Sequence, residues 1–227
     1  GLPHQTRESW SYSLGEAIAT SVPHVSVYML EVDQDSRLGR ELIAGGTKYH
    51  AHFVPDDDLA ADFYETACER LNAAGIRQYE ISNFAREGFQ SRHNLKYWTR
   101  QPYLGFGVDA HSMLPAAGGR ESFRFATTDN YDQFLLSPHV TVTKVTREQA
   151  LEESFFLGLR LNRGVSVAEL SPQFGAAVDA YAPVIDELIG AGLLQHEGDS
   201  VKLTARGRLL SNEVFERFIS LQAGASR

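Results

Sequence analysis

Apolar residues recur at helical spacing in two stretches of the first half of the chain. Thr6 can cap a helix whose inner face carries four of them, Trp10, Leu14, Ala17 and Ile18. Asp56, Asp57 and Asp58 supply a cap and favourable charge for a second helix, for which Gly75 is a natural end. Its apolar positions are Leu59, Phe63, Tyr64, Ala67 and Leu71. Both stretches predict helices packed by one face.

Three short, mostly apolar runs alternate with these helices, at residues 24–30, 76–82 and 103–110. Such runs are typical of parallel strands covered on both faces, so the order predicts βαβ units. Residues 33–55 are polar and predict a loop. Gly105 and Gly107 weaken the third strand, which indicates close approach of backbone or ligand, or tight packing.

A different pattern follows residue 136. Residues 137–143 resemble a linker. Capping pairs at Thr146/Gln149 and Ser166/Glu169 begin two helices, a third covers about 178–189, and a hairpin turns at 197–199. Thr204 caps a last helix. The expected division is therefore 1–136, a linker at 137–143, a winged-helix-like α+β domain at 144–220, and a tail at 221–227.

Charge and cysteine content narrow the classes of function. The net charge is −8, and residues 144–227 carry 9 basic against 11 acidic side chains, which disfavours nucleic acid as a partner. No apolar run approaches the ~20 residues of a membrane span. The single cysteine, Cys68, cannot form a disulfide within the chain and favours a reducing, cytoplasmic location. One thiolate also cannot hold an iron–sulfur cluster.

Three predicted strands end in polar groups, Glu31, Glu80 and His111. Functional side chains of parallel barrels gather at the carboxyl ends of strands, so these three could converge on one pocket. The alternative is that Glu31 and Glu80 are solvated loop carboxylates and that His111 is a hydrogen-bonded core histidine.

The densest cluster of chemically capable side chains is His93-Asn94-Leu95-Lys96-Tyr97-Trp98. His93 can ligate heme iron, and Tyr97 and Trp98 offer flat apolar faces for a macrocycle. If the segment is helical, His93 and Tyr97 share a face. The alternative is an aromatic anchor that pins a loop.

Several motifs together resemble the radical SAM family of oxygen-independent coproporphyrinogen III oxidases and their relatives. They are residues 1–6 (GLPHQT), 24–28 (HVSVY), 78–85 (QYEISNFA), 103–112 and 192–212. Within that family, the HNxxYW pattern at 93–98 is similar to the HemW-type heme chaperone branch. The likeness implies the C-terminal portion of a partial (β/α) barrel with a winged-helix-like domain, so an α/β fold.

The resemblance also implies cofactors and site residues. It implies heme bound by His93, Asn94, Tyr97 and Trp98. It further implies S-adenosylmethionine near Gly1, Glu31 and His111, with Glu80 lining the same cavity. The family's CxxxCxxC motif, which holds a [4Fe-4S] cluster, is absent from this sequence. The chain is therefore expected to be the C-terminal part of a longer protein and inactive alone.

Three hypotheses about function remain open, and the first two of them follow from the resemblance. The first is part of a heme chaperone that delivers heme to client hemoproteins. The second is part of a coproporphyrinogen III oxidase of porphyrin biosynthesis. The third is a non-enzymatic interaction module. Loss of the covering half also predicts self-association, or dependence on the missing N-terminal half.

Overall fold

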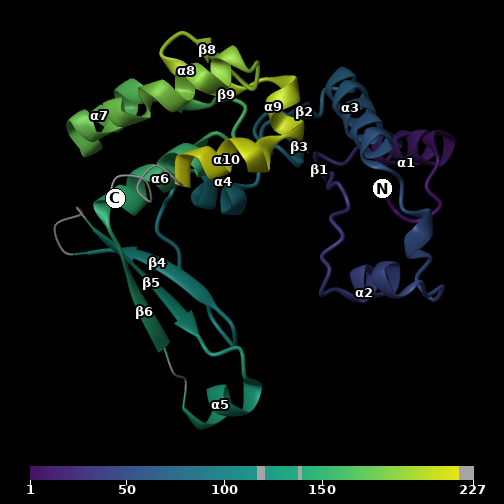
Figure 1. Cartoon of the computed structure of the whole chain (residues 1–227), viewed down its shortest axis with the longest axis horizontal. Helices are drawn as coiled ribbons and strands as arrows, with labels where there is room; N and C mark the ends of the chain where they lie inside the picture. The colour runs from purple at the N-terminus through teal and green to yellow at the C-terminus, as the bar shows by residue number, and fades with distance from the viewer. Residues whose placement is uncertain (117–120, 138–139, 220–227) are drawn as a thin grey trace. The chain divides into compact units, whose positions relative to one another are not determined.

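A computed structural model describes residues 1–116, 121–137 and 140–219. The chain divides into two compact units, Gly1–Gln90 and Ser91–Arg227. Figure 1 shows the elements of each unit. The division falls before the HNxxYW segment, whereas the sequence suggested a first domain that extends to residue 136. Residues 140–145 form a strand. This strand includes the end of the linker expected at 137–143, so that part of the segment is not an unstructured connection.

The first unit contains four helical segments and three short strands. In chain order they are α1 (Arg7–Ala19), β1 (His24–Ser26), α2 (Arg37–Ala44), the 3-10 helix η1 (Ala51–Phe53), α3 (Asp57–Ala73), β2 (Arg77–Gln78) and β3 (Asn83–Ala85). The predicted caps are confirmed, since the side chains of Thr6 and Asp56 accept hydrogen bonds from the backbone of α1 and α3. The apolar faces of both helices enter one core: Leu14, Val27, Ala67, Leu71, Ile76 and Phe84.

The strands of this unit pair antiparallel in the order β1-β3-β2, so the parallel pairing predicted from the sequence is wrong. The predicted strand at 76–82 is interrupted, because the chain turns between β2 and β3. The returning strand β3 then lies between β1 and β2. Those two strands run in the same direction, as a βαβ unit requires, but they are not neighbours.

The segment predicted to be a polar loop, residues 33–55, contains α2 and η1. Ser36 caps α2, and Gly45 ends it in the left-handed conformation. Glu41 is buried, and its carboxylate accepts hydrogen bonds from the backbone N–H groups of Tyr49 and Ala51. This buried carboxylate fixes the return of the chain toward α3.

The second unit begins with a helix and a three-stranded meander. These elements are α4 (Arg92–Trp98), β4 (His111–Pro115), β5 (Ser122–Thr127), α5 (Tyr131–Leu136) and β6 (Val140–Val145). The meander is antiparallel in the order β4-β5-β6.

The predicted strand at 103–110 is wrong, since only Tyr103 forms a bridge, with Met113. Gly107 and Asp109 have positive φ angles of 108° and 54°, which a strand does not accommodate. A Cβ atom on Gly105 would lie 2.3 Å from the carbonyl oxygen of His111, so this glycine does mark a close backbone approach.

The rest of the unit carries the predicted helices and hairpin. Its elements are α6 (Arg147–Gly158), β7 (Val165–Ser166), α7 (Val167–Phe174), η2 (Gly175–Tyr181), α8 (Ala182–Gly190), β8 (Leu194–Glu197), β9 (Ser200–Leu203), α9 (Ala205–Leu209) and α10 (Ser211–Ile219). The single helix predicted after Thr204 is two, separated at Leu210. The rings of Phe155, Tyr181 and Phe218 stack in the core, with centroids 4.6 to 6.0 Å apart.

Candidate functional site

The HNxxYW segment forms helix α4, as the sequence analysis required for a shared face. The Ser91 side chain caps the helix by accepting a hydrogen bond from the Asn94 backbone. The rings of His93 and Tyr97 lie edge to face, with centroids 5.0 Å apart at 78°. The centroid of the Tyr97 ring in turn lies 4.6 Å from that of the Tyr103 ring. Burial raises the pKa of the Tyr103 phenol. His93 is exposed, so its imidazole is accessible beside the Tyr97 ring.

A second face of α4 is turned inward. Asn94 and Trp98 are half-buried. The Arg160 guanidinium lies 4.3 Å from the centre of the Trp98 ring, a cation–π contact. The indole Nε1 of Trp98 is buried and has no hydrogen-bond partner among the residues that the structure describes. Of the four residues predicted to bind heme, His93 is therefore exposed, whereas Asn94, Tyr97 and Trp98 are half-buried.

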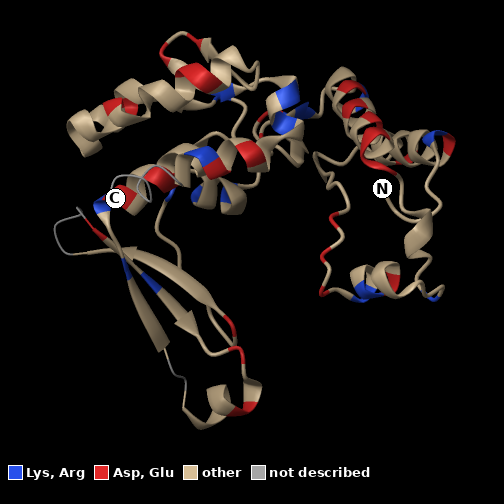
Figure 2. Cartoon of the chain, viewed as in Figure 1, with Lys and Arg blue, Asp and Glu red and all other residues tan. Residues whose placement is uncertain are grey.

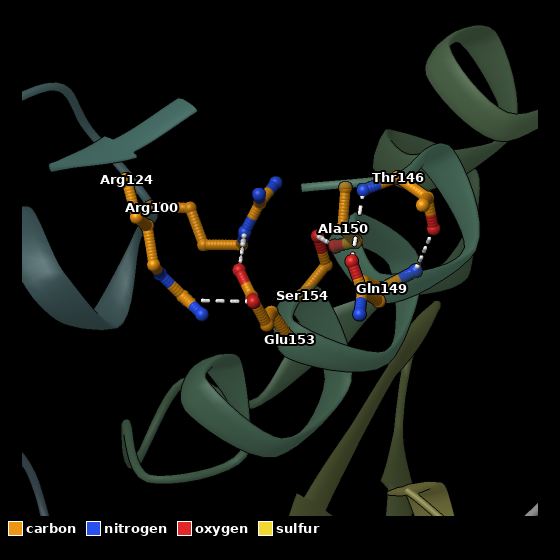
Figure 3. A network of polar contacts seen from close by, with 7 residues as sticks. All are labelled: Arg100, Arg124, Thr146, Gln149, Ala150, Glu153 and Ser154. Atoms are coloured by element: carbon orange, nitrogen blue, oxygen red, sulfur yellow. Dashed lines mark hydrogen bonds and ion pairs between the residues drawn. The ribbon is translucent and has the colours of Figure 1, made fainter. Parts of the chain in front are cut away.

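A buried carboxylate fixes the end of α4, and sequence reasoning missed it. Glu153 of α6 is only 5% exposed. It accepts hydrogen bonds from Arg100 Nε at 2.8 Å and from Arg124 Nη2 at 2.6 Å (Figure 3). Arg100 itself follows α4 with φ of 51°. Glu152-Glu153 has the pattern of an exposed acidic pair, and only contacts distant in sequence distinguish Glu153.

Gly1 and Glu31 lie together in the first unit. Both line a cavity of about 410 Å³ whose wall includes Trp10 and Tyr64, and a second hollow of about 550 Å³ whose wall includes His52. The Gly1 nitrogen donates a hydrogen bond to Gln5 Oε1 at 2.6 Å. Glu31 is exposed, so its carboxylate is available to a ligand.

The other two residues expected at that pocket, Glu80 and His111, do not line the two hollows of the first unit. Glu80 is fully buried, is not among the residues that line either hollow, and accepts hydrogen bonds from Ser82 N and Asn83 Nδ2. It stabilises the turn between β2 and β3. His111 belongs to the second unit, where it begins β4 instead of following a strand. Its side chain is 65% exposed and lies 3.7 Å from an Asp109 oxygen, so it is not a core histidine.

The residues present do not fit a [4Fe-4S] cluster. The chain's one cysteine, Cys68, lies half-buried on α3 beside the core of the first unit. Across residues 1–116, 121–137 and 140–219, no group of three or more His, Cys, Asp or Glu side chains is placed to hold a metal ion. No helix within these ranges has the length and apolarity needed to cross a membrane.

Comparison with known proteins places this geometry in a family. The HemN C-terminal domain model matches residues 145–210. The heme chaperone HemW of Bacillus subtilis is 35% identical over 223 residues, which cover 96% of this chain and 57% of that protein. HemW of Escherichia coli is 30% identical over 221 residues, which cover 97% of this chain and 56% of that protein.

A solved structure, the radical SAM enzyme coproporphyrinogen III oxidase (HemN) from Escherichia coli, superposes with a TM-score of 0.68. At 19% identity, over 96% of this chain and 52% of that one, it shows the fold. The chain spans about half the length of the relatives that it matches. The family suggested by the sequence motifs is confirmed: the chain belongs to the HemW/HemN-like family, and residues 145–210 are its HemN C-terminal domain.

Proposed function

We propose that this chain is the heme-binding part of a HemW-type heme chaperone, which receives heme on helix α4 and passes it to client hemoproteins. The observation that carries the proposal is the exposed His93 imidazole, backed by the Tyr97 ring 5.0 Å away. Imidazole nitrogen is a common axial ligand of heme iron. The aromatic pair Tyr97 and Tyr103 supplies apolar surface beside the ligand.

The other two residues of the motif have supporting roles in this proposal. Asn94 and Trp98 fix α4 against the rest of its unit, because both are half-buried and Trp98 packs against Arg160. They hold His93 at a fixed place and do not need to touch iron.

S-Adenosylmethionine and a [4Fe-4S] cluster belong to the proposal through the family. Gly1 and Glu31, which line the same hollows, would contact S-adenosylmethionine, and His111 is proposed to lie close to it. A single cysteine cannot hold the cluster, so a further segment is proposed to supply its ligands. The complete protein is proposed to act in the cytoplasm.

The rival function is decarboxylation of coproporphyrinogen III. Three curated relatives, at 35%, 32% and 30% identity, are named heme chaperones, whereas the oxidase structure is 19% identical. These identities, together with the HNxxYW motif, favour the chaperone. Nucleic acid is disfavoured by charge, and Figure 2 shows acidic residues interspersed with basic ones over the helices of the second unit.

The test is a hemin titration followed at the Soret band. Saturable binding near one equivalent is expected for the chain, and His93→Ala should lose it. His196→Ala is the matched control, since His196 is also exposed and lies in β8 of the same unit. Binding by His93→Ala with unchanged affinity would refute His93 as the ligand. Equal losses in both variants would show that hemin binds histidines nonspecifically.

A further inference from the structure

A cavity of about 260 Å³ lies in the second unit, on the inward side of the HNxxYW helix. Its wall is formed by the end of α4, by α6 and by the segment from β7 into α7. We propose that this cavity is a binding site for a small oxoanion, a carboxylate or a phosphate. The site is separate from the exposed face of α4 that carries His93, and the proposal does not depend on heme binding.

Two donors in the wall have unused hydrogen-bonding capacity. The Trp98 indole Nε1 is buried without a partner among the described residues, an arrangement that is unfavourable while no acceptor satisfies it. Arg100 is 89% buried by side-chain area and uses Nε for Glu153, and its terminal nitrogens make no hydrogen bond to any residue that the structure describes. An anionic oxygen in the cavity would supply an acceptor for the terminal nitrogens of Arg100, whereas the Trp98 Nε1 atom has no accessible surface, so the neighbouring anion would change its surroundings without accepting its hydrogen.

The charge of the wall favours an anion. Glu153 compensates Arg100, but Arg163 has no ion-pair partner in the described part of the chain. The first turn of α7 also borders the cavity through Ser166 and Glu169. A helix amino end carries partial positive charge, which adds to that of Arg163. Glu169 opposes Arg163, and solvent screens both charges because both residues are exposed, so the positive potential that remains is that of the helix amino end beside Arg100.

The size of the cavity limits the ligand. Drug-sized molecules occupy pockets of roughly 300–1,000 Å³, and this cavity is smaller than that range. A heme macrocycle is therefore excluded, whereas inorganic phosphate or a short carboxylate fits. The cavity is distinct from the exposed heme face proposed above.

The experiment uses the two tryptophans of the chain as reporters. The ¹H–¹⁵N spectrum should contain two indole signals, and Trp98→Phe identifies the one from Trp98. Inorganic phosphate and propionate are titrated separately at constant ionic strength. We expect the Trp98 signal to shift saturably with one or both anions. The Trp10 signal should not move, because its Nε1 donates to the Phe63 carbonyl at 2.7 Å.

Arg163→Gln should weaken this binding about tenfold, the loss expected for one charge-assisted hydrogen bond. Arg92→Gln is the matched control, since Arg92 is an exposed arginine of the same unit outside the cavity wall. A response to phosphate alone assigns a phosphate site, and a response to propionate alone assigns a carboxylate site. The proposal is overturned if neither anion shifts the Trp98 signal, or if both arginine variants weaken binding equally.

Discussion

Glu153 joins three elements of the second unit, and its removal tests whether this buried carboxylate holds them together. The side chain lies on α6 and accepts hydrogen bonds from Arg100, beyond the end of α4, and from Arg124 on β5 (Figure 3). Glu153→Ala leaves both guanidinium groups without their acceptor. The exposure of each guanidinium group determines how much free energy of unfolding is lost with its acceptor.

The two arginines differ in how much water replaces the lost partner. The Arg124 side chain is 47% exposed, so its bond to Glu153 should contribute at most about 1 kcal/mol. Arg100 is 11% exposed and its partner 7%, so this pair is buried. Removing one member of a buried pair costs roughly 3–5 kcal/mol. That loss is a large part of the about 5–15 kcal/mol that a domain's stability amounts to.

Urea unfolding measures the difference in free energy, provided that the slope is unchanged between variants. Glu153→Ala should lower the free energy of unfolding by about 3–5 kcal/mol, and Arg124→Ala by about 1 kcal/mol or less. Glu152→Ala is the matched control. Burial, and then the negative charge of Glu153, raises the pKa of the Glu152 carboxyl. The folded structure therefore does not favour the ionised form of Glu152, and removing this side chain should cost little. A loss below about 1 kcal/mol for Glu153→Ala would refute the conclusion that this buried carboxylate holds the three elements together.

Three further outcomes are expected. Gly105→Ala places a Cβ atom 2.3 Å from a backbone oxygen and should cost about 1–3 kcal/mol in urea unfolding, whereas Gly190→Ala, with open space around it, should not. Burial raises the pKa of Tyr181 to about 12, so its contribution to stability is complete below pH 10 and is lost as pH rises toward 12; alkaline melts of Tyr181→Phe should lack this loss. Hydrogen bonds from Arg217 lower the pKa of Glu187, so that contribution is present above pH 4.5 and is lost as pH falls below it; acid melts of Glu187→Gln should be flatter, and unchanged melts would contradict the pairing.

Helices and their caps were predictable because their causes are local. Thr6, Asp56 and Thr146 each accept a hydrogen bond from a backbone group three residues further on. The spacing of apolar residues then identified the buried faces of α1 and α3. The missed helix α2 has a polar, short pattern, and it is held because its own Glu41 carboxylate accepts hydrogen bonds from backbone N–H groups eight and ten residues further along the chain. Such a contact leaves no periodic signal.

Strand pairing was less predictable because a short apolar run does not indicate whether its strand pairs parallel or antiparallel with its neighbour. The run at 76–82 breaks where Glu80 accepts hydrogen bonds from Ser82 and Asn83, and this turn reverses the chain into β3. A carboxylate near a strand end therefore has two uses, ligand binding or turn formation. Periodicity alone does not separate them, and for Glu80 the second is observed.

The HNxxYW segment left two interpretations open, a heme ligand or an aromatic anchor, and helix geometry makes them compatible. At about 100° per residue, positions i and i+4 lie on one face, and the adjacent pair lies on the next. His93 is exposed and its ring contacts that of Tyr97, whereas Tyr97 itself, Asn94 and Trp98 are all half-buried, and Trp98 packs against Arg160. One turn of helix thus anchors itself through Trp98 while it presents His93. Because the two functions reside on different residues, Trp98→Ala should lower stability and His93→Ala should lower only hemin affinity. The pair of variants therefore separates anchoring from binding.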